Sequence, residues 1–153
     1  MIVAGPIARV ETADLPAIRH LVEAALRGGV TQIEAEVAFL LDDIGGSLDE
    51  WAAAPVGKLH LKYVDGGAIA GVILVKDWWN LTNLFVDPGR QRRGVGRALM
   101  ANVLDQCRGR SPRGALLVNS STNAVGFYRR LGFVASGEPR DRIGGCVPLR
   151  YDF

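Results

Sequence analysis

Cysteine and histidine are scarce in this chain, and their spacing gives no support to a structural metal site. The 153 residues include two cysteines, Cys107 and Cys146, and two histidines, His20 and His60. None of them forms a CxxC or HxxxH pair, the spacings in which zinc ligands usually occur. We therefore expect no metal, while a single disulfide between the two cysteines stays open.

Long apolar runs and a strong charge of one sign are also lacking. No stretch approaches the roughly 18 apolar residues of a membrane-spanning helix. The opening MIVAGPIARV lacks the basic region and long apolar core of a signal peptide. We expect a cytoplasmic protein with no membrane partner. The formal net charge of +2 is too small to indicate nucleic-acid binding by itself, and 48% hydrophobic residues favour one soluble globular domain over residues 1–153.

Hydrophobic periodicity predicts a chain that mixes strands and helices. The expected strands are residues 7–10, 58–64, 68–75, 79–86, 114–119, 133–136 and 146–151. The expected helices are one from residue 15 to the glycines 28–29, one from residue 31 to the glycines 45–46, one over 95–107, and one from Ser121 or Asn123 to Gly132. Residues 47–55 stay open between a helical turn and a loop. The alternation within 58–64 places His60 on an exposed face.

Residues 84–100, LFVDPGRQRRGVGRALM, are typical of a phosphate site between a strand and a helix. An apolar run ends at Asp87, a basic glycine turn follows over residues 89–96, and a helical pattern opens at Val95. The first N–H groups of a helix have no internal partners, and the helix dipole favours an anion there. Four arginines fall within eight positions, which indicates a local anion site: Arg90, Arg92, Arg93 and Arg97.

Two common phosphate motifs do not fit this turn. A Walker A loop needs GxxxxGK[ST], and no Lys-Ser or Lys-Thr follows a glycine turn here. A dinucleotide fingerprint needs GxGxxG at the first strand–helix turn, whereas position 99 is Leu and several strands precede this turn.

The spacing Gln91-x-x-Gly94-x-Gly96 resembles the acetyl-coenzyme A (acetyl-CoA) signature of the GNAT acetyltransferases. The FVDP of residues 85–88 looks like that family's fourth strand, and NAVGFYRRLGF of residues 123–133 is similar to its last motif. The resemblance implies an N-acetyltransferase that moves the acetyl group of acetyl-CoA to a primary amine. It also implies an α+β fold with a mixed, mostly antiparallel, splayed central sheet of six to seven strands and four helices.

The resemblance assigns roles to particular residues. Tyr128 matches the family tyrosine that protonates the departing thiolate, and a phenol is a plausible general acid for it. The backbone of residues 84–86 would pair with the pantetheine arm, and the N–H groups of residues 92–97 would bind the pyrophosphate. Ser121 stands where the family more often has an asparagine. The cofactor-binding residues so implied are Leu84, Phe85, Val86, Arg92, Arg93, Gly94, Val95, Gly96, Arg97, Ser121 and Asn123.

The acceptor and the general base are left open by the sequence. In this family the acceptor cleft lies between residues equivalent to 27–44 and 137–145, and its occupant here is a small molecule or a protein amine. The strand before Tyr128 carries no carboxylate. Four acidic residues are candidates to take the amine proton, although each is more simply explained as a surface charge: Glu34, Glu36, Asp77 and Asp87. A water relay, or a residue that the sequence does not identify, is the preferred base. A homodimer also stays open.

Two other classes of function are alternatives to the acetyltransferase hypothesis. A non-catalytic acyl-CoA-binding regulatory module would keep the glycine turn, but Tyr128 argues against it. A nucleic-acid-binding domain would use the arginine cluster, but the charge is near neutral and no aromatic-rich basic face is visible, so we expect no nucleic-acid partner.

Overall fold

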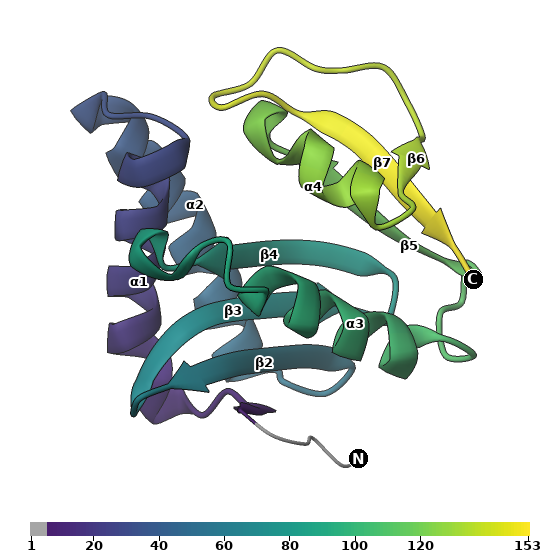
Figure 1. Cartoon of the computed structure of the whole chain (residues 1–153), viewed down its shortest axis with the longest axis horizontal. Coiled ribbons are helices and arrows are strands. Elements are labelled where there is room, and N and C mark those ends of the chain that lie inside the picture. Colours follow the sequence, from purple (N-terminus) through teal and green to yellow (C-terminus); the bar gives the residue numbers. More distant parts are fainter. Residues whose placement is uncertain (1–5) are drawn as a thin grey trace.

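A seven-stranded sheet forms the centre of the computed structural model, which describes residues 6–153 (Figure 1). The strands are β1 (Ile7–Arg9), β2 (Lys58–Asp65), β3 (Ala68–Lys76), β4 (Asn80–Val86), β5 (Ala115–Ser120), β6 (Val134–Ala135) and β7 (Val147–Asp152). Their order in the sheet is β1-β2-β3-β4-β5-β7-β6, and only β4 and β5 are parallel neighbours. The expected mixed, mostly antiparallel α+β fold is confirmed.

Helices cover both faces of this sheet. They are α1 (Leu15–Gly29), α2 (Glu34–Ala53), α3 (Val95–Cys107) and α4 (Val125–Arg130). Val72 and Leu74 of β3 pack with α1 and α2, whereas Ile73 packs with α3 and α4. Because successive side chains of a strand point to opposite faces, the two helix pairs lie on opposite sides of the sheet (Figure 1).

The sheet opens between β4 and β5, as the expected splay requires. The two strands pair only at Asn80↔Leu117 and Leu81↔Val118, and beyond that point they separate. On its other edge β4 contains a bulge, because Leu74 pairs with Asn83 while Val75 pairs with Leu81. Thr82 is therefore the extra residue, and a bulge of this kind bends its strand.

Two predictions on one side of the fold are wrong, and they share a cause. Helix α2 does not stop at Gly45 and Gly46 but continues to Ala53, so residues 47–53 of the segment that the sequence left open are helix and residues 54–55 are not. Gly45 does not have a left-handed φ, so it does not end the helix. Its lack of a side chain leaves room for Arg19 of α1, because a Cβ atom at position 45 would lie 2.8 Å from the Arg19 guanidinium. The extended helix brings Trp51 onto β2. His60 is consequently 3% exposed, with its ring 4.5 Å from that of Trp51.

The two cysteines do not form a disulfide. Cys107 and Cys146 are both free and buried. Within residues 6–153, no helix combines the length and the apolarity needed to cross a bilayer.

Candidate active site

The glycine turn after β4 leaves the start of α3 without a side-chain cap. Asp87 accepts a hydrogen bond from the N–H of Gly89 at 3.1 Å, which bends the chain out of the strand. Gly94 then takes a left-handed conformation, with φ 80°, directly before Val95. Glycine adopts this conformation without strain. No side chain of residues 6–153 caps the N–H groups of the first turn of α3, which leaves them available to an anion.

The four arginines of this turn divide into two pairs. Arg90 forms ion pairs with Asp87 at 2.9 Å and with Asp65 at 3.1 Å, and Arg93 lies 3.9 Å from Asp65. These two arginines thus link the turn by ion pairs to Asp65, at the end of β2. Arg92 and Arg97 form no ion pair with any described residue and line the pocket beside the turn.

This pocket, called the turn pocket here, has a volume of about 670 Å³. It is lined by the glycine turn, the end of β4, and the start and one side of α4. Ten of the eleven predicted cofactor residues line it: Leu84, Phe85, Val86, Arg92, Gly94, Val95, Gly96, Arg97, Ser121 and Asn123. The side chain of Arg93 does not line it, because it is turned toward Asp65. Arg130 of α4, which the sequence did not single out, joins the lining.

The open edge of β4 presents backbone groups to the gap in the sheet. The N–H of Asp87 donates to the carbonyl of Ala70 in β3 at 2.8 Å. Because peptide groups alternate in direction along a strand, those of Leu84 and Val86 face away from β3, toward the gap. An extended ligand can therefore pair with these two residues, whereas the peptide group of Phe85 faces β3.

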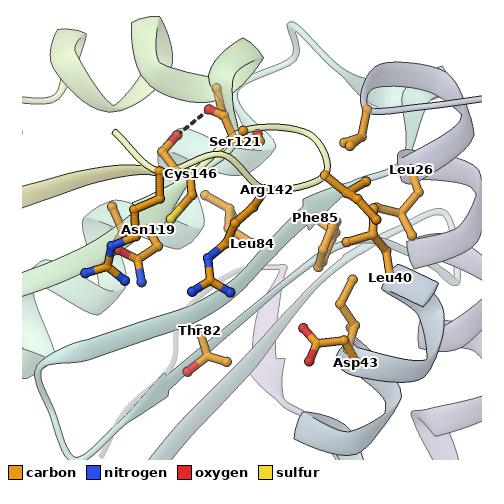
Figure 2. A pocket seen from close by; sticks show the side chains of 18 of the residues that line it. Leu26, Leu40, Asp43, Thr82, Leu84, Phe85, Asn119, Ser121, Arg142 and Cys146 are labelled. Carbon is orange, nitrogen blue, oxygen red and sulfur yellow. Dashed lines mark hydrogen bonds between the residues drawn. The ribbon is translucent and has the colours of Figure 1, made fainter. Parts of the chain in front are cut away.

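A second cavity of about 800 Å³, called the loop pocket here, adjoins the turn pocket and is shown in Figure 2. Apolar side chains from α1 and α2 form one wall, and the loop between β6 and β7 forms another. These are the two segments, 27–44 and 137–145, that the family resemblance associates with the acceptor. The charged residues of its lining are Asp43, Arg140, Asp141 and Arg142. Figure 2 shows Asp43 and Arg142 pointing into the cavity from opposite elements.

Tyr128 stands where the two pockets meet. Six residues line both of them: Val30, Leu84, Phe85, Ser121, Ala124 and Tyr128. The Tyr128 ring is 5% exposed and packs edge-on against Phe127 and Phe133, with centroids 5.3 and 5.2 Å away. Burial raises the pKa of Tyr128 well above its usual range. The phenol therefore keeps its proton throughout the neutral range.

Ser121 and Asn123 connect α4 to α1 across the gap. The hydroxyl of Ser121 donates to the side-chain oxygen of Asn123 at 2.7 Å, and the Asn123 amide donates to the carbonyl of Gly29. Both residues line the turn pocket, but the Asn123 amide nitrogen already has a protein partner. The pair thus holds the last turn of α1 against the start of α4.

None of the four proposed bases lines either pocket. Glu34 pairs with Arg27 at 2.6 Å, and Glu36 accepts a hydrogen bond from the hydroxyl of Thr31. Sequence reasoning missed Asp43, a carboxylate that does line the loop pocket. One signal was available, because Asp43 follows Phe39 and Leu40 by four and three positions and so shares their side of the helix.

Comparison with known proteins agrees with this geometry. The family model of the GNAT acetyltransferase domain matches residues 48–148. The peptidyl-lysine N-acetyltransferase YjaB of Salmonella typhimurium is 27% identical over 120 residues, covering 76% of this chain and 80% of that protein. The [ribosomal protein bS18]-alanine N-acetyltransferase of Escherichia coli is 29% identical over 134 residues, covering 83% and 79%. The PaiA N-acetyltransferase of Thermoplasma acidophilum, solved in complex with coenzyme A, superposes with a TM-score of 0.77 at 17% identity, covering 96% of this chain and 98% of that one.

The chain therefore belongs to the GNAT acetyltransferase family, as the glycine turn and the Tyr128 motif predicted. It is an acetyl-CoA-dependent acetyltransferase.

Proposed function

We propose that this protein transfers the acetyl group of acetyl-CoA directly to a primary amine, with Tyr128 as the general acid. The observation that carries the proposal is the position of Tyr128, which lines both the turn pocket and the loop pocket. A donor held in the first pocket and an acceptor held in the second would meet beside its hydroxyl. The relatives act on a lysine or an alanine amine, which supports an amine as the acceptor.

The turn pocket suits coenzyme A in three respects. The N–H groups of residues 92–97 surround an uncapped helix start, which favours a pyrophosphate. Arg92 and Arg97 add positive charge beside it. The peptide groups of Leu84 and Val86 are available to pair with the amide-containing pantetheine arm, which would lead the thioester along β4 to Tyr128.

The chemistry then follows from these positions. The lone pair of the amine attacks the thioester carbon, and an N–H near Val86 stabilises the negative charge that develops on the carbonyl oxygen. The carbon–sulfur bond breaks, its electron pair goes to sulfur, and the Tyr128 hydroxyl gives its proton to that sulfur. The amine loses a proton to water in the loop pocket, where Asp43 is a carboxylate that can receive it. That proton returns to the phenolate, so the protein ends the cycle unchanged.

Replacing Tyr128 by phenylalanine tests the assignment. A general acid contributes about 10²–10⁴ in rate. We expect Tyr128→Phe to lower turnover, read as free thiol released, by a factor in this range, with little change in coenzyme A affinity. Tyr151→Phe is the matched control, because Tyr151 packs against Phe133 but lines neither pocket.

Two results would contradict the proposal. Unchanged turnover of Tyr128→Phe over the whole pH profile would remove Tyr128 from the chemistry. Absence of thiol release by the unaltered protein with every amine of a broad panel would favour the non-catalytic acyl-CoA-binding module instead.

A further inference from the structure

Most arginines outside the two pockets have a partner within the protein. Arg19 pairs with Asp49, Arg27 with Glu23 and Glu34, Arg90 with Asp65 and Asp87, and Arg150 with Asp152. Arg108, Arg110 and Arg113 lie over the rings of Phe153, Trp78 and Trp79. An arginine that has no such partner and also lines a pocket is therefore informative in this molecule.

The loop pocket contains two arginines of this kind. Neither Arg140 nor Arg142 forms a salt bridge or stacks on a ring within the described part of the chain. Asp141, between them in sequence, pairs with neither. Figure 2 shows the Arg142 guanidinium extending into the cavity. Its five N–H donors are therefore directed at the space an acceptor would occupy.

The loop that carries these arginines is held in place by backbone hydrogen bonds. The N–H of Arg140 donates to the carbonyl of Cys146, and the N–H of Gly145 donates to the carbonyl of Arg142, each at 2.8 Å. The N–H of Thr122, at the start of the α4 region, donates to Gly144 at 2.9 Å. Gly144 and Gly145 both have positive φ, 77° and 86°, which closes the turn tightly. The guanidinium of Arg142 thus projects from a positioned backbone, which lowers the entropy lost on binding.

The opposite wall has different chemistry. Leu26 and Leu40 supply apolar surface from α1 and α2, and Phe85 adds an aromatic ring. Asp43 supplies a negative charge from α2, and no salt bridge joins it to Arg142. An occupant that complements the cavity has an apolar body, an anionic group for Arg142 and an ammonium group for Asp43.

We propose that the acceptor is an amine that also carries a carboxylate, which Arg142 binds while Asp43 attracts the ammonium group. The ammonium group then gives its proton to water and becomes the neutral amine that attacks the thioester. Arg140 adds positive charge on the same side. A guanidinium matches a carboxylate with two parallel hydrogen bonds, which gives orientation as well as attraction. This inference rests on the proposed function, because it names the substrate class of the same reaction. Free amino acids with apolar side chains, and peptides with an acidic residue beside the amine, both present this chemistry.

Pairs of amines that differ only in the carboxylate test the proposal. Leucine is compared with isopentylamine, and phenylalanine with phenethylamine. A peptide arm compares Ala-Asp-amide with Ala-Asn-amide. Two quantities are measured for each pair: kcat/KM by thiol release, and the dissociation constant for the protein loaded with coenzyme A, by calorimetry. We expect the carboxylate-bearing member of at least one pair to be preferred by about 10-fold to 100-fold in both. The arm in which the preference appears identifies the source of the carboxylate.

Variants of Arg142 assign the preference to one side chain. Arg142→Met should bring the ratio within each preferred pair close to one, and Arg142→Glu should reverse it. Arg129→Met is the control, since Arg129 is exposed and unpaired among the described residues but lines neither pocket. It should leave the ratio unchanged.

The outcomes separate this inference from the proposed function. Ratios near one for every pair of the unaltered protein, or equal effects of Arg142→Met and Arg129→Met, would overturn the carboxylate assignment. Selective binding without any acetyl transfer would support it and contradict the proposed reaction. Acetyl transfer with no preference for the carboxylate-bearing amine would support the proposed reaction and contradict the carboxylate assignment.

Discussion

His60 gives the stability of this fold a pH dependence that can be measured. Its side chain is 3% exposed in β2, and neither ring nitrogen has a hydrogen-bond partner within residues 6–153. Trp51 covers the ring. Burial lowers the pKa of His60 from 6.5 to about 4, and the nearby Asp14 carboxylate opposes this only in part. The folded protein therefore contains a neutral histidine at pH values where the unfolded chain contains a charged one.

The sign and the size of the effect follow from this difference. Between pH 6.5 and about 4 the unfolded state binds the proton and the folded state does not. The His60 contribution is thus fully present above the unfolded pKa of 6.5 and is lost as the pH falls through this window. At about 1.4 kcal/mol per pH unit, the full interval corresponds to roughly 3 kcal/mol of unfolding free energy. This is a large part of the ~5–15 kcal/mol that stabilises an ordinary domain.

Urea unfolding at several pH values from 7.5 to 4.5 measures this contribution. His60→Leu removes the titrating group while keeping an apolar side chain beside Trp51. Its unfolding free energy should fall less over that range than that of the unaltered protein, by about 2–3 kcal/mol. His20→Leu is the matched control, because His20 is exposed on α1, and it should keep the steeper dependence. Equal slopes for His60→Leu and the unaltered protein would refute the reasoning, as would an NMR titration of the His60 ring in the folded state near pH 6.5.

Two further predictions concern the turn pocket and the core. Arg130 lines the turn pocket and its guanidinium lies over Gly126, whereas the adjacent Arg129 does not line it. Arg130→Met should weaken coenzyme A binding several-fold at low salt, and Arg129→Met should not; equal effects in calorimetry would contradict a role for Arg130. Cys107 is fully buried, and burial raises the pKa of its thiol to about 11. Iodoacetamide at pH 7.5 should therefore leave Cys107 unmodified until the protein is unfolded, and mass spectrometry showing rapid labelling in the folded state would be the contrary result.

Elements with local signals were predictable from the sequence. Helix α3 spans Val95–Cys107 as the periodicity predicted, because Gly94 marks its start and the apolar spacing continues unbroken. The β2–β3 hairpin turns at Gly66 and Gly67, both with positive φ, as the Asp-Gly-Gly sequence indicated. These features depend on the conformational preferences of neighbouring residues, which a sequence records directly.

Features that depend on distant contacts were not predictable in this way. Gly45 and Gly46 look like a helix stop, but the packing of Arg19 from α1 makes Gly45 a place of close approach within a continuous helix. The alternation in β2 predicted an exposed His60. A pattern within one strand cannot show that α2 continues as far as Trp51 and covers the histidine ring. In both positions tertiary packing overrides the local pattern.

In the candidate site, too, features with a local sequence signal were predictable and features that depend on distant contacts were not. Most residues that line the turn pocket were predictable because they form one contiguous strand–turn–helix segment. The separation of Arg90 and Arg93 from Arg92 and Arg97 was not, since it depends on Asp65 arriving from another hairpin. Asp43 was also missed, because only the arrangement of α2 opposite the β6–β7 loop gives it a cavity to line.

Both pockets have a common origin in the separation of β4 from β5. Parallel strands joined by a helix send their carboxyl ends to the same edge of the sheet, so the glycine turn after β4 and the α4 region after β5 begin side by side. The bulge at Thr82 directly follows the two positions at which β4 pairs with β5, and both cavities are lined by residues of β4 beyond this point. The two cavities in this arrangement cannot be shaped independently along β4. The loop pocket is instead free to vary in α2 and in the β6–β7 loop, where Asp43 and Arg142 lie.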